Sequence, residues 1–331
     1  MQTITGTDIS KAKQFLINGE LVAIPTETVY GLAANALNSA AVIKIFEVKN
    51  RPAFNPLIIH CINWQMAQQY VQQVPEKAHL LAEKFTPGPL TFLLKKKDII
   101  PDLVTAGSDK VAVRIPNHLL TLALLESIDF PLAAPSANPF GYISPTTAAH
   151  VLENLNEKIP YILDGGTAAV GLESTIIGFE ENDRILLYRS GGISVEQIEK
   201  VINEKVIAAP SSQKNPETSG QLKSHYAPHT PLYIGNIDQL KNKFEGKKIA
   251  TISFTKHIDG IDTNYEFVLS PKGNLHEAAS NLFAALRKID QLEADIILTE
   301  PFPNEGIGRA INDRLNRAKA ENKEEFTPPY N

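Results

Sequence analysis

The chain has 331 residues, which is long for one domain and suits two, and hydrophobic residues make up 43% of it. The net charge of -5 gives no support to a nucleic-acid-binding class, so an anion site would have to be a local gathering of Lys and Arg. The single cysteine, Cys61, excludes a disulfide framework or a Cys-based metal site within the chain.

The sequence shows no targeting or membrane segment. Residues 1–19 lack a basic region followed by a continuous apolar run, so we expect no signal peptide. No stretch approaches the ~20 apolar residues of a membrane helix. Together with the lone cysteine, these features predict a cytoplasmic protein.

In the first half of the chain, short apolar runs alternate with helical patterns. Asp8 and Ser10 can cap a first helix. Further helices are expected at residues 40–48, 65–71, 76–85 and 194–201, and strands at 21–24, 57–59, 91–95, 111–115, 131–134 and 162–163. Strands at 174–179 and 184–188 flank a polar turn and favour a hairpin. Because the strands are short, mixed and interrupted by Pro, we expect residues 1–205 to form an α+β domain with a twisted mixed sheet.

Residues 206–231 differ from both flanks, since they are rich in Pro, Ser and Asn and resemble a linker. Beyond them the pattern becomes regular. Strands are expected at 232–234, 248–254, 267–269 and 295–298, and helices at 275–292 and 307–320. This alternation predicts a smaller Rossmann-like α/β domain over residues 232–331, so the fold class of the whole chain is α/β.

One loop concentrates polar chemistry directly after a buried strand. The segment Pro25-Thr-Glu-Thr-Val-Tyr-Gly31 gathers two hydroxyls, a carboxylate and a phenol in one turn. A structural turn rarely needs that variety, which favours a binding loop. The alternative is a capped strand–helix junction whose Thr and Glu side chains satisfy backbone donors, and the residues alone leave both interpretations open.

A cation pair follows the second helix. Lys49 and Arg51 end that helix, where the helix dipole alone would favour cations. The chain then passes Asn55 and runs down a buried strand to His60. Lys and Arg so placed can converge on a phosphate. Cys61 points to the opposite side of the strand from His60 and is expected in the core.

Polar side chains also interrupt two later apolar runs. Arg114 lies on an otherwise apolar strand and needs a carboxylate or phosphate partner, with an internal salt bridge as the structural alternative. Ser136 and Asn138 follow a buried strand among small residues that let a ligand approach the backbone. A simple Ser/Asn turn is the alternative for this second segment.

Two further segments combine glycine, cations and aromatic groups. Ser174 begins a strand after glycine-rich turns, and Arg189 is followed by a Gly-Gly pair, a combination typical of a phosphate cradle or, alternatively, of a loop that leads to a capped helix. In the linker, Lys223-Ser-His225-Tyr226 is too polar and aromatic for a spacer. It favours a segment that folds over an active site, with a surface patch as the alternative.

Common cofactor motifs are missing from the sequence. It contains no G-x-x-x-x-G-K-[ST] loop, no G-x-G-x-x-G and no H-E-x-x-H, and its histidines show no metal-ligand spacing. A phosphate site would therefore have to be of a less stereotyped kind, and we expect no metal held by protein residues.

Taken in order, the motifs P-T-E-T-x-Y-G, K-x-R-P-x-x-N-P-L, G-P-L-T, V-R-x-P, A-P-S-A-N, E-S-T and R-x-G resemble those of the YrdC-type threonylcarbamoyl-AMP synthases over residues 1 to about 205. The S-H-Y-A-P linker and the C-terminal α/β domain are similar to the two-domain form of this family. Individually these motifs are weak, but their shared order is specific.

The resemblance implies a nucleotidyltransferase that converts L-threonine, bicarbonate and ATP to threonylcarbamoyl-AMP and pyrophosphate. It also implies that the product passes to a tRNA threonylcarbamoyl transferase complex, for N6-threonylcarbamoyladenosine at position 37 of tRNA, with a weak tRNA contact also considered. Mg²⁺ would bridge the phosphates. The chemistry would then rest on positioning and on stabilising phosphate charge.

Motif matching assigns the implied roles residue by residue. Lys49 and Arg51 are the implied catalytic pair. The implied ATP-binding residues are Arg51, Asn55, Lys110, Ser136, Asn138, Ser144, Arg189 and Tyr226, and the implied L-threonine-binding residues are Thr26, Thr28, His60, Arg114, Ala134 through its backbone, and Ser174. Lys110 stands where the family often has Thr, and the linker lacks the family's Pro and Met and has Ser224 in place of an Arg. These departures bear on the lid that Tyr226 would form, not on the reaction.

Two competing functions remain at the level of sequence. A YrdC-type fold could bind double-stranded RNA or tRNA without chemistry, which would need a basic face that the net charge does not support. A hydrogenase-maturation carbamoyltransferase would need zinc-finger Cys clusters, which a single cysteine excludes.

Overall fold

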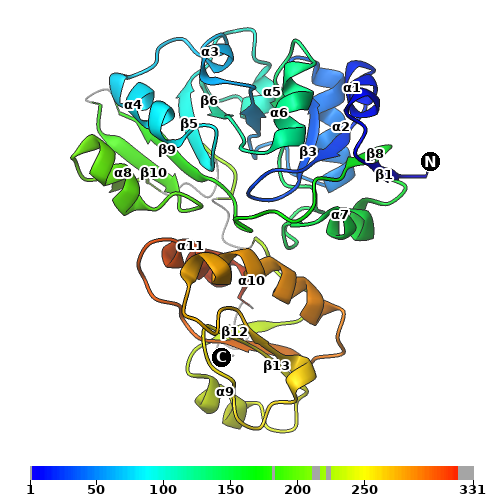
Figure 1. The fold of residues 1–331 in the computed structure, drawn as a ribbon, viewed down its shortest axis with the longest axis vertical. Helices are drawn as coiled ribbons and strands as arrows, with labels where there is room; N and C mark the ends of the chain where they lie inside the picture. Colours follow the sequence, from blue (N-terminus) through cyan, green and yellow to red (C-terminus); the bar gives the residue numbers. More distant parts are fainter. Residues whose placement is uncertain (1, 181–182, 211–216, 221–224, 320–331) are drawn as a thin grey trace, which may run out of the picture.

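The computed structural model describes residues 2–180, 183–210, 217–220 and 225–319. It shows a larger N-terminal part and a smaller C-terminal part stacked along the long axis of the molecule (Figure 1). Two stretches of the linker, 211–216 and 221–224, lie outside the described residues, as do the expected turn residues 181–182 and the end of the last expected helix. No helix in the described ranges combines the length and the apolar character needed to cross a membrane.

The N-terminal part is built on one mixed sheet, which has eleven strands in the described part of the chain. In sheet order the strands are β1 (Ile4–Gly6), β8 (Tyr161–Leu163), β2 (Val22–Ile24), β3 (Gly31–Asn35), β7 (Leu132–Ala133), β4 (Ile58–His60), β6 (Lys110–Arg114), β5 (Leu90–Lys95), β9 (Thr175–Phe179), β10 (Ile185–Arg189) and β11 (Ile207–Ala208). Parallel and antiparallel pairs alternate irregularly, which confirms the expected mixed sheet.

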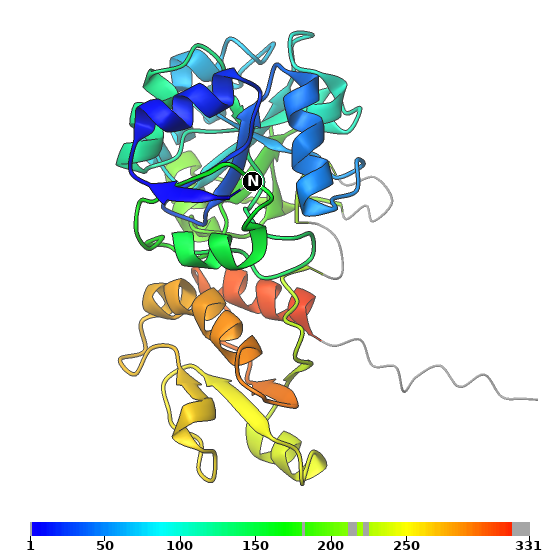
Figure 2. The same ribbon diagram turned by 90° about the vertical axis from the view of Figure 1, so that its right-hand side faces the viewer.

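Helices cover this sheet and bury its apolar side chains, as the two perpendicular views show (Figures 1 and 2). They are α1 (Ile9–Ile17), α2 (Ser39–Lys49), α3 (Trp64–Ala67), α4 (Glu76–Phe85), α5 (Asp102–Thr105), α6 (Leu119–Glu126), α7 (Ala148–Leu155) and α8 (Val195–Ile202). The expected hairpin is present, since β9 and β10 pair antiparallel with Phe179 opposite Ile185.

The second helix sets the position of the cation pair. Its first turn is capped by Asn38, whose side chain accepts from the backbone N–H groups of Ala40 and Ala41. It ends at Asn50, which adopts the left-handed conformation that closes many helices. Lys49 is therefore the last residue of α2, and Arg51 is the first residue after its cap, Asn50.

One strand beside the binding loop was not expected. β3 begins at Gly31 and pairs antiparallel with β2, with Ile24 opposite Gly31. Its sequence, Gly-Leu-Ala-Ala-Asn, has no β-branched residue and so a weak intrinsic preference for a strand. Pairing on both edges, with β2 and β7, holds it in the sheet. The loop 25–31 is therefore the connection of a hairpin rather than a strand–helix junction.

The C-terminal part is a parallel sheet covered by helices. Its strands lie in the order β12 (Leu232–Ile234), β15 (Ile296–Thr299), β13 (Ile249–Ser253) and β14 (Glu266–Val268), and its helices are α9 (Ile237–Lys243), α10 (Leu275–Asp290) and α11 (Gly308–Ala318), with a 3₁₀ turn at Thr263–Tyr265. All three strand pairs are parallel, which confirms the expected Rossmann-like arrangement.

The two parts pack against each other through α10 and α11, which lie between the small sheet and the N-terminal part (Figure 1). One apolar cluster joins them, in which Val29, Ile143 and Leu172 of the N-terminal part lie with Leu282 and Phe283 of α10. Because Val29 belongs to the loop 25–31, this packing brings the C-terminal part next to the loop predicted to bind a ligand.

Candidate active site

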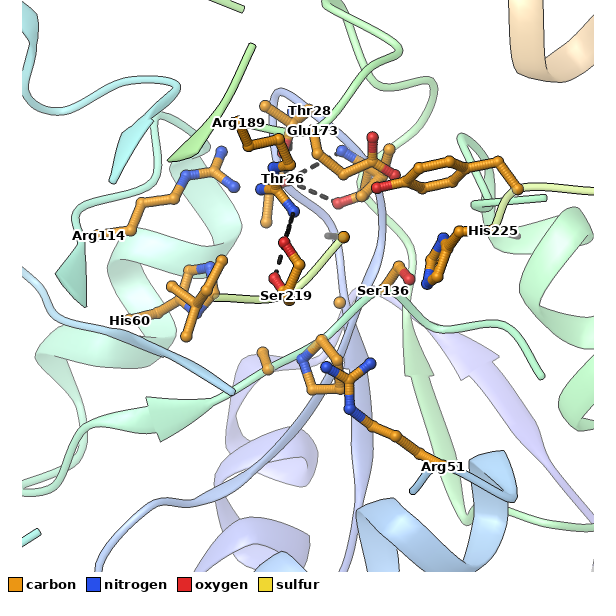
Figure 3. A pocket seen from close by; sticks show the side chains of 17 residues that line it. Thr26, Thr28, Arg51, His60, Arg114, Ser136, Glu173, Arg189, Ser219 and His225 are labelled. Atoms are coloured by element: carbon orange, nitrogen blue, oxygen red, sulfur yellow. Dashed lines mark hydrogen bonds between the residues drawn. The ribbon is translucent and has the colours of Figure 1, made fainter. Parts of the chain in front are cut away.

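A small cavity of about 50 Å³ lies where the loop 25–31 meets the ends of several strands. Its walls come from segments far apart in the sequence (Figure 3). The lining residues are Thr26, Thr28, Val29, Gly31, Arg51, Ile58, His60, Arg114, Ala134, Pro135, Ser136, Glu173, Arg189, Ser219, Gly220, His225 and Tyr226. Thus the structure brings together, around one cavity, most of the segments that the sequence singled out separately.

The binding loop is held rigidly by its own hydroxyls. The Thr26 hydroxyl donates to the carbonyl of Val29 at 2.6 Å and lies 2.8 Å from the Thr28 hydroxyl. Since the one proton of Thr26 goes to Val29, the Thr28 hydroxyl is the donor to Thr26. Both side chains are buried and line the cavity, so the acceptor lone pairs of Thr28 face a confined polar space.

Arg114 is paired with a carboxylate of the same loop. Its Nη2 lies 2.8 Å from Oε1 of Glu27, and both side chains are nearly fully buried. The other oxygen of Glu27 accepts from the backbone N–H of Asn117 at 3.0 Å. The internal salt bridge considered for Arg114 therefore exists. Arg114 still lines the cavity, so its guanidinium is both an ion-pair partner and part of the wall.

His60 ends β4 directly opposite Arg114 on β6. It is buried, and its Nδ1 has no hydrogen-bond partner within the described residues. Burial, reinforced by the charge of Arg114, lowers the pKa of His60 to about 3. The imidazole is therefore neutral at physiological pH and offers an unused ring nitrogen at the cavity wall.

Two buried guanidiniums face the cavity without a carboxylate partner among the described residues. Arg51 donates to the carbonyls of Asn55 at 3.1 Å and Pro56 at 2.9 Å. Arg189, at the end of β10, donates to the Ser174 carbonyl at 3.0 Å and hydroxyl at 3.1 Å, and to the Ser219 hydroxyl at 3.2 Å. Burial lowers the pKa of both, that of Arg51 to about 9. Uncompensated buried cations are costly, which is typical of a site for an anion.

Lys49 is not among the residues that line the cavity. Its ammonium is 1% exposed and donates to the backbone carbonyls of Ser136, at 2.6 Å, and Asn138. Burial, together with the charge of Arg51, lowers its pKa well below the ordinary value. Lys49 thus lies behind the cavity wall, where it fixes the segment that carries Ser136.

Other predicted residues also lie behind the lining. Asn55 is fully buried, and neither amide atom has a partner in the described part of the chain. Ser144 donates to Oε1 of Glu173 at 2.5 Å, and the Ser174 hydroxyl lies 2.7 Å from that of Thr91. Asn138 uses its amide nitrogen on the carbonyls of Pro139 and Tyr142, while its Oδ1 is unpartnered within the described ranges.

Lys110 does not line the cavity. Its ammonium lies 3.3 Å from Oε1 of Glu217, and the side chain is partly exposed. Since Glu217 also accepts from the Tyr188 hydroxyl at 2.6 Å, Lys110 ties the linker to the sheet beside the site.

Linker residues close the cavity from the side of the C-terminal part. Tyr226 is 1% exposed and adopts a left-handed backbone conformation, with its ring stacked on Phe283 of α10 at 5.6 Å. His225 packs edge-on against the rings of Tyr226 and Phe140. The cavity beneath is far smaller than the roughly 300–1,000 Å³ of ordinary ligand pockets, so a ligand of ordinary size would need its walls to move.

Sequence reasoning missed several wall residues. Glu27 and Glu173 lie within the motifs, but motif matching assigns them no role. The position of Arg114 on an apolar strand predicts a carboxylate or phosphate partner without identifying it. Ser219 and Gly220 carried no signal beyond linker composition. No group of three or more His, Cys, Asp or Glu side chains that could hold a metal occurs in the described residues.

The fold and the site define a class, that of YrdC-type domains with a polar, arginine-lined cavity and an added α/β domain. A family model described as "Telomere recombination" matches residues 14–191, and one described as "Threonylcarbamoyl-AMP synthase, C-terminal domain" matches residues 193–320.

Two curated relatives carry the name threonylcarbamoyl-AMP synthase. The protein of Pyrococcus abyssi is 42% identical over 93% of this chain and 92% of its own length, and that of Bacillus subtilis is 39% identical over 94% and 92%. The crystal structure of P. abyssi Sua5 complexed with L-threonine matches with a TM-score of 0.87 and 40% identity, covering 96% of both chains. The chain therefore belongs to the threonylcarbamoyl-AMP synthase family, in its two-domain form.

Proposed function

We infer that the chain is a nucleotidyltransferase that makes threonylcarbamoyl-AMP and pyrophosphate from L-threonine, bicarbonate and ATP. Family membership over nearly the whole chain supports this reaction. The structural observation that carries it is the pair Arg51 and Arg189, two buried guanidiniums that face one cavity with no carboxylate partner among the described residues. ATP brings the negative charge that such a wall requires.

We propose that threonine binds at the end of the cavity formed by the loop 25–31. Thr26 and Thr28 offer hydroxyls, His60 a neutral ring nitrogen, and Arg114 a guanidinium for the amino-acid carboxylate. Ala134 contributes through its backbone. Ser174 stands one layer behind, where it orients Arg189, and it is retained as a proposed contact.

The phosphates of ATP are proposed to lie between Arg51 and Arg189. Ser136, Asn138, Asn55 and Ser144 complete the proposed nucleotide site. Both amide atoms of Asn55 and Oδ1 of Asn138 have no partner in the described part of the chain, which supports a polar ligand near them. Lys49 supports this site by fixing the backbone of Ser136 and Asn138, in addition to the catalytic role implied by its motif. Lys110 is kept as a contact at the rim.

Tyr226 is proposed to act as a cover that moves when ATP enters. The cavity of about 50 Å³ is too small for a nucleotide, and Tyr226 and His225 are part of its wall. Loops that close over a substrate and exclude water are a common device in enzymes that protect a reactive intermediate.

The proposed chemistry needs no covalent bond to the protein. The amine of threonine and bicarbonate give a carbamate and water, and a carbamate oxygen then attacks the α-phosphorus while pyrophosphate leaves. The chain would position the reactants and stabilise charge on the phosphates through Arg51 and Arg189.

Mg²⁺ belongs to this proposal only through the phosphates. The two carboxylates of the cavity wall, Glu27 and Glu173, are each engaged by an arginine, so they do not fit a protein-held metal site. A magnesium ion bound with ATP would neutralise part of the phosphate charge. The product would pass to a tRNA threonylcarbamoyl transferase complex for modification of adenosine 37, and a weak contact with tRNA remains part of the proposal.

Pyrophosphate release tests the inferred reaction. Purified protein with ATP and Mg²⁺ should release pyrophosphate only when both L-threonine and bicarbonate are present, and omission of either should return the rate to background. Release that persists without threonine would contradict the inferred function.

A further inference from the structure

One carboxylate of the cavity wall lies between arginines of the two parts of the molecule. Glu173 precedes β9 and is buried. Its Oε2 accepts from Nε of Arg314 at 2.8 Å, and its Oε1 accepts from the Ser144 hydroxyl at 2.5 Å. Arg189 lines the same cavity close to Glu173, as Figure 3 shows. Glu173 therefore lies within electrostatic reach of both arginines, and its ion pair is with Arg314.

Arg314 reaches Glu173 from the C-terminal part. It lies on α11, and its side chain is fully buried at the interface. Besides Glu173, the guanidinium donates to the Ser190 carbonyl at 3.0 Å and to Asp313 at 2.7 Å, and it lies 5.1 Å from the ring centre of Tyr226. A single side chain of the C-terminal part thus contacts two wall residues of the proposed ATP site.

The two arginines have different hydrogen-bond partners. The donors of Arg189 go to Ser174 and Ser219, whereas the carboxylate of Glu173 is engaged by Arg314. Burial alone would raise the pKa of Glu173, but the positive charges of Arg314 and Arg189 outweigh burial and lower it. Glu173 is therefore an anion at neutral pH and needs a cationic partner.

We propose that Arg314 is a positioning residue that pairs with Glu173 and so keeps the charge of Arg189 available for the anionic substrate. Without Arg314, the buried carboxylate would turn to Arg189 and neutralise it. Docking of the C-terminal part would then be a condition for ATP binding, because that part supplies the competing cation. This proposal deepens the inferred function, on which it rests for the role of Arg189.

The test compares Arg314→Met with a matched variant on the same helix. Arg309 pairs with Glu196 of α8 at 2.7 Å, also across the interface, but both side chains are partly exposed and neither lines the cavity. We expect Arg314→Met to weaken ATP binding, measured by calorimetry on the full chain, and to lower kcat/KM for ATP by about tenfold or more. Arg309→Met should change both by less than about threefold.

A double variant distinguishes the positioning role proposed for Arg314 from a role in docking the C-terminal part. Glu173→Gln removes the same ion pair, so it cannot restore docking, but it also removes the carboxylate that would capture Arg189. The double variant Glu173→Gln/Arg314→Met should therefore bind ATP more tightly than Arg314→Met alone, close to Glu173→Gln. Arg314→Lys, which keeps a charge beside Glu173 without the planar fork, should fall between wild type and Arg314→Met.

The proposal is overturned if Arg314→Met behaves like Arg309→Met. It is also overturned if the loss of ATP affinity in the double variant equals the sum of the losses in Glu173→Gln and Arg314→Met. The proposal about Arg314 can be tested even if the inferred reaction is wrong, because inorganic tripolyphosphate can replace ATP in the binding measurement. If the wild type binds tripolyphosphate but forms no product, the reaction is wrong, and the same comparison of variants still decides the role of Arg314.

Discussion

The cations around the cavity differ in what compensates their charge. Arg114 has Glu27 and Arg314 has Glu173, whereas Lys49 and Arg51 each have two backbone carbonyls and no carboxylate within the described residues. Of these two, Arg51 lines the cavity and Lys49 does not. A residue whose charge is balanced inside the protein, or that lies behind the lining, mainly supports structure. One that lines the cavity with its charge unbalanced is available for a ligand, and its removal should lower turnover.

Arg51 and Lys49 should therefore respond differently to substitution. Either substitution by Met leaves two buried backbone carbonyls without a donor, so the free energy of unfolding should fall by about 1–3 kcal/mol in both variants. Arg51→Met also removes a charge that lines the cavity, so turnover should fall by about 100-fold or more, and by more than in Lys49→Met. Denaturant unfolding and initial rates measure both quantities. Turnover that falls more in Lys49→Met than in Arg51→Met would contradict this division of roles.

His60 should make stability depend on pH in the acidic range. Its pKa is about 3 in the folded protein because of burial and then of Arg114, against about 6.5 in an unfolded chain. Between these values the unfolded state binds one more proton, so stability falls as the pH falls through this window, by about 1.4 kcal/mol per pH unit. Above pH 6.5 the imidazole is neutral in both states.

In the variant His60→Gln, the unfolded state can no longer bind the extra proton at position 60. Between pH 6 and pH 4, the free energy of unfolding should fall less steeply in His60→Gln than in wild type, by about one proton. Between pH 7 and pH 8 the two slopes should coincide, which serves as the internal control. Equal slopes in the acidic range would mean that His60 takes up a proton in the folded state.

At this scale the sequence identified which residue types matter but not their partners. The need of Arg114 for a carboxylate followed from its apolar strand, yet only the fold brings Glu27 to it, because separation along the chain says nothing about that contact. Lys49 was predicted to end a helix, and its burial depends on the return of residues 136–138 over that end.

Strand ends and the loop 25–31 bring these side chains together around the cavity. The loop 25–31 joins β2 to β3, His60 ends β4, Arg114 ends β6 and Arg189 ends β10. Strands with strong local patterns, such as the hairpin of β9 and β10, were predicted from the sequence. β3 was not, because its alanines have little intrinsic preference for a strand and its neighbours in the sheet stabilise it.

The turn after β10 gives a test of this placement. Gly191 packs so closely on the backbone of Glu173 and Ser174 that an added Cβ would overlap atoms of both. Gly191→Ala should therefore push β9 and the end of β10 apart, lower the free energy of unfolding by about 1–3 kcal/mol and reduce turnover through Arg189. Thermal unfolding and initial rates measure the two effects.

Gly235→Ala is the matched control in the C-terminal part. Its Cβ would come 3.3 Å from Cδ1 of Leu240, the end of a flexible side chain. We expect a small change in stability and no change in turnover. A Gly191→Ala variant as stable and active as this control would show that the close approach does not hold Glu173 and Arg189 in place.

At the scale of the whole molecule, the two parts pack against each other beside one site, whose lining comes from the N-terminal part and the linker. The order of strands and helices predicted two sheets, and both exist. Their mutual packing could not be predicted, because Arg287 and Arg314 resemble surface residues in sequence and are nevertheless buried at the interface. The division into residues 1–205, 206–231 and 232–331 stays a prediction, and β11 extends the first sheet to Ala208.

The central claim is that one cavity joins threonine, bicarbonate and ATP, and the product tests it most directly. The full chain should be incubated with ATP, Mg²⁺, L-threonine and ¹³C-labelled bicarbonate, and the nucleotides analysed by mass spectrometry. The account predicts an adenylate that contains both threonine and the labelled carbon, and predicts that Arg51→Met greatly reduces it. Formation of AMP or an adenylate without the label or without threonine would contradict the account.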